Sequence, residues 1–309
     1  MHADGATAQP IDVAADDPRL DDFRGVRDRE LRGTLGLHAV ESERVVRRFL
    51  AAALRRAANP MPPALEPRSL LVTPDACDRL ADMTARFPAL AVYRCADERA
   101  LHAITGYTMH SGAILLGVRH EDGTVADLGA WLARTPHEPR EVLVALDGIT
   151  QTDNVGAIFR NAASFGARAA ILSPRASDPF LRKTLRVSMG RALDIPWCRA
   201  SAAEWPVCLD ALRREHGYAI IAAEDTPDAI ELARFTASSH ASAGRMLVVF
   251  GAEQDGVSRA VLDLADAVVK IPMLHAGTAL ARDLADDPPS LNVSIASAVM
   301  LHGLLARGA

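Results

Sequence analysis

Residues 141–166 read EVLVALDGITQTDNVGAIFRNAASFG, and this stretch decides the fold of the C-terminal half of the chain. The five residues after Glu141 are aliphatic, as in a strand that is buried on both faces of a sheet. A polar turn follows, and apolar residues then recur at helical spacing from about Asn154 to Phe165, where Gly166 is a suitable C-cap. A strand, a turn and a helix in this order predict the first unit of a parallel α/β domain.

Further apolar runs follow this unit and alternate with helix-like segments. The expected strands lie at 169–173, 195–198, 218–223, 246–251 and 268–273. This alternation predicts a parallel sheet with helices on both faces. Ligands of such sheets bind beyond the carboxyl ends of the strands, so we expect the functional site in the polar or glycine-rich segments at those ends. These segments are 147–156, 251–258 and 274–292.

The N-terminal half shows a second alternation of helix and strand patterns, which predicts a small α/β domain. Its expected elements are an amphipathic helix at 36–56, strands at 69–73, 91–95 and 113–118, and helices at 75–86 and 97–105. Glycine and proline interrupt the pattern between 120 and 139. The predicted domains are therefore a flexible tail at 1–20, a first domain at 21–119, a linker at 120–139 and a second domain at 140–309.

Composition excludes several classes of protein. The N-terminus lacks the basic and apolar regions of a secretory signal, and the apolar stretch 291–306 is too short and too polar to span a bilayer. The four cysteines form neither a CxxC pair nor a disulfide framework, and the ten histidines form no metal-binding motif. We expect a cytoplasmic protein without a membrane segment and without a metal.

Charge gives divided evidence on nucleic-acid binding. The net charge of −5 argues against it, but the segment from Arg19 to Pro60 contains ten arginines and only six acidic residues, so its local charge is positive. The candidate phosphate contacts are Arg24, Arg27, Arg29 and Arg32. The alternative is that arginine supplies nearly all positive charge in this chain, which has only two lysines, as is common when genomes are GC-rich.

Three motifs lie at the predicted strand ends, and neither a GxGxxG nor a P-loop motif accompanies them. They are DNVGAIFR at 153–160, GAEQDGVS at 251–258 and SLNVS at 290–294. In this order they resemble the signature motifs of the SpoU-type, TrmH-like RNA methyltransferases of the SPOUT superfamily. IPM at 271–273 also matches the family, and residues 21–118, which end in HSGA at 110–113, resemble the ribosomal-protein-like RNA-binding domain found in many members.

The resemblance implies a specific fold and activity. The fold would be a parallel α/β sheet with a trefoil knot in its C-terminal region, preceded by the small α/β RNA-binding domain. The activity would be transfer of a methyl group from S-adenosylmethionine to a ribose 2′-hydroxyl of structured ribosomal or transfer RNA. A homodimer would form beside the knot, and the N-terminal domain would select the site.

The resemblance also assigns roles to individual residues. Gly251, Ile271 and Leu291 match the cofactor contacts of the family. The expected catalytic residues are Asn154, Arg160, Glu253, Ser290 and Asn292. Each has a plainer alternative: Arg160 could be an exposed helix residue, Asn154 or Ser290 an N-cap, and Glu253 a solvated turn acid. A guanidinium is always protonated in ordinary settings, so we expect Arg160 to grip phosphate and to orient the hydroxyl or help to deprotonate it.

Two departures from the family pattern bear on the cofactor site. Sixteen residues, 274–289, separate Met273 from Ser290 where the family usually has about five, and this insertion could be a lid, a dimer contact or a disordered loop. Val257 replaces the more usual leucine. Two other functions remain open: a catalytically inactive RNA-binding or ribosome-assembly protein with the same fold, and a small-molecule methyltransferase or cofactor-binding regulator.

Overall fold

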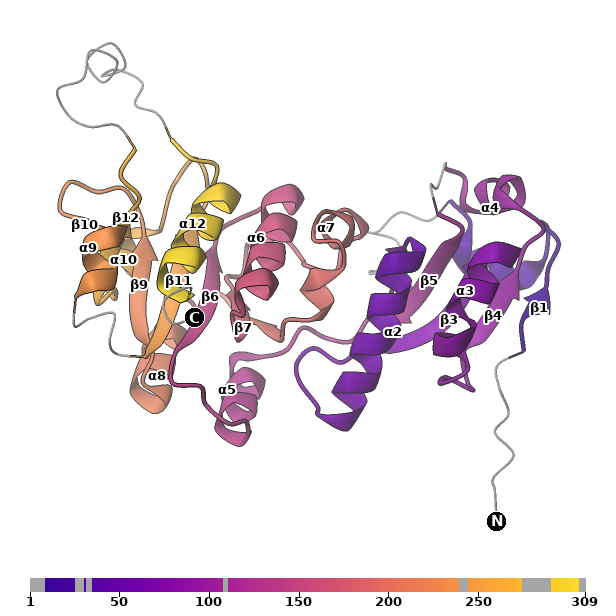
Figure 1. Cartoon of the computed structure of the whole chain (residues 1–309), viewed down its shortest axis with the longest axis horizontal. Helices are drawn as coiled ribbons and strands as arrows, with labels where there is room; N and C mark the ends of the chain where they lie inside the picture. The colour runs from indigo at the N-terminus through magenta and orange to yellow at the C-terminus, as the bar shows by residue number, and fades with distance from the viewer. Residues whose placement is uncertain are drawn as a thin grey trace, which may run out of the picture. The chain divides into compact units, whose positions relative to one another are not determined.

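The computed structural model describes residues 9–25, 31, 35–107, 111–238, 244–273 and 290–305. The chain forms two compact units (Figure 1). Unit 1 comprises Met1–Glu121 and Pro179–Asp194, and unit 2 comprises Asp122–Asp178 and Ile195–Ala309. Both are α/β structures, as the sequence predicts.

Unit 1 is built on a five-stranded mixed sheet with the order β1-β4-β3-β5-β2. Strand β5 is antiparallel to both of its neighbours, and the remaining pairs are parallel. The strands are β1 (Ile11–Asp12), β2 (Leu37–Glu41), β3 (Glu66–Val72), β4 (Ala91–Arg94) and β5 (Ala113–Val118).

Helices cover both faces of this sheet. Successive residues of a strand point to opposite faces, and consecutive apolar residues in strands such as β5 therefore make both faces apolar. Helix α2 (Glu43–Ala58) packs on one face, where Phe49 contacts the ring of His38, and α3 (Pro74–Thr84) packs against α2. Leu37 and Ala39 point to the opposite face, where they join a core with the 3-10 helix η1 (Pro18–Phe23) and α4 (Glu98–Thr105).

Two expectations about unit 1 are wrong. The chain is ordered within the supposed tail, because β1 pairs with β4 and Leu20 is completely buried; residues 1–8 lie outside the described residues. The helix expected at 36–56 is a strand and a helix, β2 followed by α2. Short apolar runs suit either state, and Ser42, which caps α2 through Val45 N, marks the actual helix start.

Unit 2 contains a seven-stranded, fully parallel sheet with the order β10-β12-β9-β11-β6-β7-β8. Strand β6 is buried along its whole length, as a central parallel strand should be. The strands are β6 (Glu141–Asp147), β7 (Ala169–Leu172), β8 (Trp197–Arg199), β9 (Ala219–Ala223), β10 (Ile230–Glu231), β11 (Arg245–Gly251) and β12 (Ala267–Lys270).

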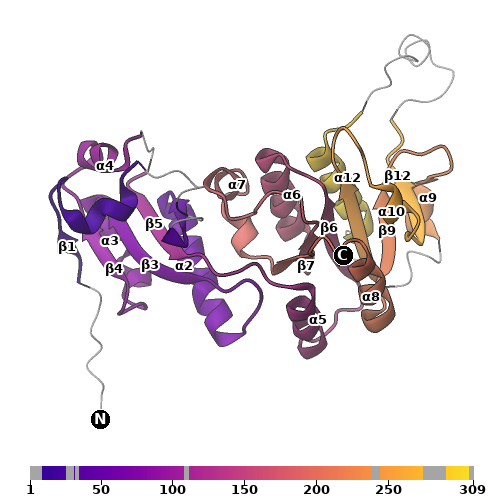
Figure 2. The same cartoon turned by 180° about the vertical axis from the view of Figure 1, so that it is seen from behind.

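The helices of unit 2 pack around its sheet and form the surroundings of the strand ends. Helices α6 and α12 lie side by side in both views (Figures 1 and 2). Asn161 on α6 joins them by donating to Ser294 O at 2.7 Å and Ser297 Oγ at 2.9 Å. The helices are α5 (Val125–Arg134), α6 (Thr152–Phe165), α8 (Val207–His216), α9 (Leu232–Ala237), α10 (Arg259–Leu262) and α12 (Val293–Leu305).

The linker expected at 120–139 instead contains helix α5, which packs against α8 and β8. Thr124 and Asp127 form a capping box, and Leu128, Trp131 and Leu132 are buried. Their spacing outweighs the effect of a single glycine in the helix. Unit 2 therefore begins near Asp122.

The segment Pro179–Asp194 lies in the sequence of the predicted second domain but packs within unit 1. Its helix α7 (Arg182–Val187) contacts β2, and Arg182 pairs with Glu41 at 2.8 Å. Buried Arg56 donates to the carbonyl of Leu193 at 2.9 Å, in the short helix η3 (Arg191–Leu193). These are long-range contacts, so local sequence patterns did not indicate them.

Three further expectations concern the chain as a whole. Within the described ranges, no helix is long and apolar enough to cross a membrane, and no group of His, Cys, Asp and Glu is suited to hold a metal ion. The insertion 274–289 lies outside the described residues. The expected trefoil knot would include that segment, so this prediction also lies outside the described residues.

Candidate active site

The GAEQDGVS motif forms a tight turn at the end of β11. Its two glycines are required because a side chain at either position would clash with neighbouring atoms. A Cβ on Gly251 would lie 2.0 Å from the carbonyl carbon of Gly256. Gly256 has a φ of +65°, which L side chains rarely adopt, and a Cβ there would lie 2.4 Å from Glu224 Oε2. The turn is therefore compact, and it holds the backbone of 251–257 against the ends of the neighbouring strands.

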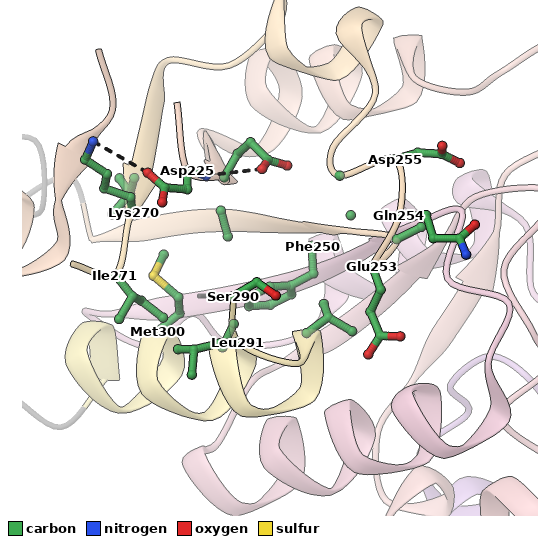
Figure 3. Close-up of a pocket in the computed structure, with 18 of the residues that line it drawn as sticks. Asp225, Phe250, Glu253, Gln254, Asp255, Lys270, Ile271, Ser290, Leu291 and Met300 are labelled. Carbon is green, nitrogen blue, oxygen red and sulfur yellow. Dashed lines mark hydrogen bonds and ion pairs between the residues drawn. The ribbon is translucent and has the colours of Figure 1, made fainter. Parts of the chain in front are cut away.

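A cavity of about 340 Å³ lies beside this turn, at the carboxyl ends of β9, β11 and β12 (Figure 3). The three predicted cofactor positions, Gly251, Ile271 and Leu291, all line it. Phe250, Val293 and Met300 form apolar parts of its walls, and charged and polar side chains line the rest. Ser290 and Glu253, two of the predicted catalytic residues, also line this cavity.

Three predicted catalytic residues from three different segments are joined by hydrogen bonds. Asn292 Nδ2 donates to Asn154 Oδ1 at 3.0 Å and also to Glu253 Oε1. Figure 3 shows Glu253 pointing toward the beginning of α12. The motifs at 153–160, 251–258 and 290–294 thus meet at one point, as their positions at strand ends predict.

The capping alternatives for these residues are resolved by the local structure. Gln151 occupies the N-cap position of α6, whereas Asn154 lies inside the helix, is 5% exposed and also donates to Gln151 Oε1. Asn292 Oδ1 accepts from the backbone N–H of Ser294 at 2.9 Å, so Asn292, and not Ser290, supports the first turn of α12.

Arg160 lies on α6, six residues after Asn154, and its side chain is exposed. Among the residues that the structure describes, it makes no hydrogen bond or ion pair. A guanidinium without a partner remains available to a phosphate or another anion.

Two acidic residues that were not predicted from the sequence hold the turn of residues 251–258 in place. Asp147, at the end of β6, accepts from Ser258 N at 2.9 Å and from Trp205 Nε1 at 3.0 Å. Glu224 directly follows β9 and accepts from Val257 N at 2.6 Å. Asp147 ends β6 and Glu224 follows β9, so both acids lie at the carboxyl end of a strand. That position could have identified them in the sequence.

Asp225 and Lys270 are two further cavity residues that sequence reasoning missed. Lys270 Nζ lies 3.6 Å from an Asp225 carboxylate oxygen and donates to the carbonyl of Thr226 at 3.0 Å. Lys270 ends β12 and is one of only two lysines in the chain, so its rarity was a possible signal.

The predicted RNA-binding arginines are only partly described. Arg27, Arg29 and Arg32 lie outside the described residues. Arg24 pairs with Asp21 at 3.0 Å and donates to the carbonyl of Asp17 at 2.9 Å. An exposed pair of this kind is weak and exchanges readily with a phosphate partner.

Comparison with solved structures defines the class of fold. The S-adenosylmethionine-bound rRNA methyltransferase of Sinorhizobium meliloti superposes with a TM-score of 0.69 over 95% of this chain and 97% of that chain, at 19% identity. The SpoU methyltransferase AviRb of Streptomyces viridochromogenes gives 0.67 over 94% and 97%, at 22% identity. The fold is that of the SpoU, or SPOUT, methyltransferases.

Sequence comparison identifies the family. The model of the SpoU rRNA methylase family matches residues 141–302. An uncharacterized tRNA/rRNA methyltransferase of Mycobacterium tuberculosis is 32% identical over 306 residues, which are 98% of this chain and 93% of the relative. The 23S rRNA (guanosine-2′-O-)-methyltransferase RlmB of Vibrio vulnificus is 33% identical over 162 residues, 52% of this chain and 57% of the relative. The chain belongs to the SpoU rRNA methylase family and is an RNA methyltransferase of that family.

Proposed function

We propose that this protein transfers a methyl group from S-adenosylmethionine to a ribose 2′-hydroxyl of structured ribosomal or transfer RNA. The observation that carries the proposal is the hydrogen-bonded group Asn154, Asn292 and Glu253 beside the cavity lined by Gly251, Ile271 and Leu291. The similarity to RlmB, which is named as a guanosine 2′-O-methyltransferase, supports the choice of ribose. We place the activity in the cytoplasm, where these RNAs function.

The cavity suits the adenosyl cofactor in size and in chemistry. Its volume of about 340 Å³ lies in the range of small-molecule sites, and apolar walls suit a base and a thioether-like chain. Glu224 and Asp225 provide carboxylates for hydroxyl or ammonium groups, and the backbone of the 251–256 turn provides donors and acceptors. The cofactor supplies an activated methyl group on sulfur.

The residues around the cavity would position the acceptor hydroxyl for this transfer. In the proposed transfer a C–O bond would form as the C–S bond breaks, S-adenosylhomocysteine would leave, and the hydroxyl proton would pass to the Glu253 carboxylate or to water. Such a transfer requires the hydroxyl oxygen to lie within about 3 to 3.5 Å of the methyl carbon. Asn292, fixed between Asn154 and Glu253, would hold the Glu253 carboxylate in place, and that carboxylate can accept a hydrogen bond from the hydroxyl. Arg160 would bind an adjacent phosphate and orient the ribose.

We further propose a homodimer formed through α12. This helix is apolar on every side, which is typical of a helix buried on all faces. Ile295 and Val299 are nevertheless 53% and 39% exposed, and they are one helical turn apart on the same face. A second copy of the chain would cover them.

The proposal also includes RNA binding by four arginines of the first unit, which are Arg24, Arg27, Arg29 and Arg32. Replacing all four by glutamine should weaken RNA binding and lower the slope of log affinity against log salt by about 0.7 to 0.9 for each phosphate that is no longer neutralised. Filter binding at several salt concentrations measures this slope. Parent-like affinity and slope in a folded mutant would show that substrate selection lies elsewhere.

Mass-spectrometric mapping of ribose methylation tests the function directly. Ribosomal and transfer RNA from cells with and without the gene should differ at one ribose, and purified protein with S-adenosylmethionine should restore that methyl group. Identical maps together with RNA binding would favour an inactive RNA-binding protein. Failure to bind RNA would favour a small-molecule substrate.

A further inference from the structure

A second cavity of about 310 Å³ lies in unit 2, and its lining includes the residues Ala252, Asp255 and Gly256 of the GAEQDGVS turn. The cofactor cavity is lined by the same three residues. In Figure 3 the Asp255 side chain points away from Ile271 and Leu291. The second cavity therefore adjoins the turn that carries Glu253, at the carboxyl ends of β6 and β7.

Trp205 forms one wall of this second cavity. Its indole N–H donates to Asp147 Oδ1 at 3.0 Å, and its side chain is partly exposed. Because the polar atom of the ring already has a partner, Trp205 offers the cavity only apolar and π surface. Such a ring is a stacking platform for a nucleobase.

Arg175 lies on the rim of the same cavity, on the turn that follows β7. Its side chain is exposed, and it forms no hydrogen bond or ion pair with any other described residue. A guanidinium in this state binds phosphate in a planar, two-pronged geometry. Stacking surface and phosphate-binding group are thus presented by one cavity.

The backbone that carries these groups is fixed by several hydrogen bonds. Arg199 donates to the carbonyls of Ser173 at 3.2 Å and Ala176 at 2.6 Å, which holds the turn around Arg175. Ser173 Oγ accepts from Gly148 N at 2.8 Å and so ties this turn to the end of β6. The site is therefore preorganised, which lowers the entropic cost of binding.

We propose that this cavity is a subsite for a nucleotide of the RNA substrate, with the base stacked on Trp205 and a phosphate bound by Arg175. The inference rests on the proposed function, because it places an RNA nucleotide next to the ribose that is methylated. Asp147 and Asp255 line the same cavity, so the subsite favours a base that presents amino groups to carboxylates.

Tryptophan fluorescence can report on this subsite directly. The chain has three tryptophans, and Trp131 and Trp197 are only 7% and 0% exposed, so an added adenosine hexaribonucleotide should quench Trp205 alone. Quenching should be lost in Trp205→Phe, which keeps an aromatic ring and should still bind the oligonucleotide. Quenching that persists in Trp205→Phe would contradict the proposal.

Affinity for ribosomal and transfer RNA, taken from cells that lack the gene, provides the second test. Trp205→Ala should bind about tenfold more weakly, within the usual range for removal of one stacked base. Arg175→Gln should lower the salt slope by about 0.7 to 0.9. The matched control is Arg214→Gln, which removes an exposed arginine outside the cavity and should bind like the parent.

The outcomes separate this inference from the proposed function. Cofactor affinity, measured by calorimetry, should be unchanged in Arg175→Gln and Arg214→Gln and should be retained in the Trp205 variants, where Asp147 keeps its bond to Ser258 N; binding shows that each variant is folded. If the parent methylates RNA while Trp205→Ala and Arg175→Gln match it in affinity and salt slope, the subsite is wrong and the function stands. If the parent binds the cofactor but neither binds nor methylates RNA, the proposed function fails.

Discussion

Asn292 is the residue through which the three motifs are joined. Its amide nitrogen donates to Asn154 and Glu253, while its oxygen accepts from the first turn of α12. One side chain therefore fixes the start of a helix and orients a carboxylate at the same time. Asparagine suits this position because its short side chain supplies two N–H donors and an oxygen acceptor together, and all are used here.

Arg160 is expected to be required for methyl transfer but not for cofactor binding, because it does not line the cofactor cavity. Arg160→Ala should reduce turnover by at least about a hundredfold. Arg160→Lys should lose turnover as well, because lysine lacks the planar guanidinium that binds phosphate through two N–H groups. Tritium transfer to RNA and calorimetric titration of S-adenosylmethionine measure the two properties. Arg214→Lys is the control, and high turnover by either Arg160 variant would exclude the proposed role.

At the scale of elements, strand β6 begins at a buried ion cluster that contributes to stability. Glu141 is 3% exposed and accepts from Tyr218 OH at 2.7 Å and from Glu138 N at 2.6 Å, and it pairs with Arg168. Burial by itself would raise the pKa of Glu141, but the hydrogen bonds from Tyr218 and His137 and the charge of Arg168 outweigh it and lower the pKa.

The lowered pKa of Glu141 predicts the direction of a pH effect. Its stabilising contribution is complete above its unfolded-state pKa of about 4.3 and disappears as pH falls through the lower folded value. Glu141→Gln should reduce the free energy of unfolding at neutral pH by about 3 kcal/mol, because the largely buried Arg168 loses its carboxylate partner. The same change should make the free energy of unfolding depend less on pH on the acid side. Urea unfolding at a series of pH values from about 3 to about 7 measures both effects.

The surface pair Glu43 and Arg79 supplies the control for this experiment. Glu43→Gln should cost less than about 1 kcal/mol, since exposed ion pairs contribute little. If Glu141→Gln and Glu43→Gln lose equal stability, the buried cluster does not have the role assigned to it.

Helix α12 is the element whose exposed face tests the proposed dimer. Ile295→Asp combined with Val299→Asp should convert a dimer into a monomer, because a carboxylate buried in an apolar interface is strongly destabilising. Size-exclusion chromatography with light scattering measures the mass. Val207→Asp on α8, at a side chain that is 59% exposed, is the control and should leave the mass unchanged. A parent that is monomeric at all concentrations would refute the dimer.

At the scale of the whole molecule, the division into units predicts which fragment is stable. A fragment of residues 122–309 retains α5, whereas 140–309 lacks Leu128, Trp131 and Leu132. Burial of each such side chain contributes about 1.5 to 3 kcal/mol, so the shorter fragment should melt at a clearly lower temperature. Both fragments contain Pro179–Asp194, and the absence of its partners in unit 1 affects them equally.

Thermal melting with and without S-adenosylmethionine measures this difference. The longer fragment should be stabilised by the cofactor, since every residue that lines the first cavity lies within it. Equal melting temperatures for the two fragments would mean that α5 does not belong to the stable part of unit 2. Absence of stabilisation in a folded fragment would contradict the cofactor assignment.

The sequence by itself determined the features that depend on short-range patterns. The buried run at 142–146 predicts the central strand, and the motifs at strand ends predict a site that the structure brings together. The carboxyl ends of parallel strands lie on the same edge of a sheet, so motifs at strand ends are expected on that edge. The spatial order of the strands, with β11 beside β6, then makes them neighbours. The three positions that the family resemblance assigns to the cofactor, Gly251, Ile271 and Leu291, also line one cavity.

Only the tertiary structure decided which distant residues complete these features. Asp147 and Glu224 hold the turn of 251–258 through backbone N–H groups, and no pattern along the chain marks which carboxylate reaches which amide. Likewise, Pro179–Asp194 packs within unit 1 through contacts with residues that are distant in the sequence, such as the hydrogen bond from Arg56 to the carbonyl of Leu193. The physical reason is that burial against a distant surface outweighs local propensity, and that surface exists only once the chain has folded.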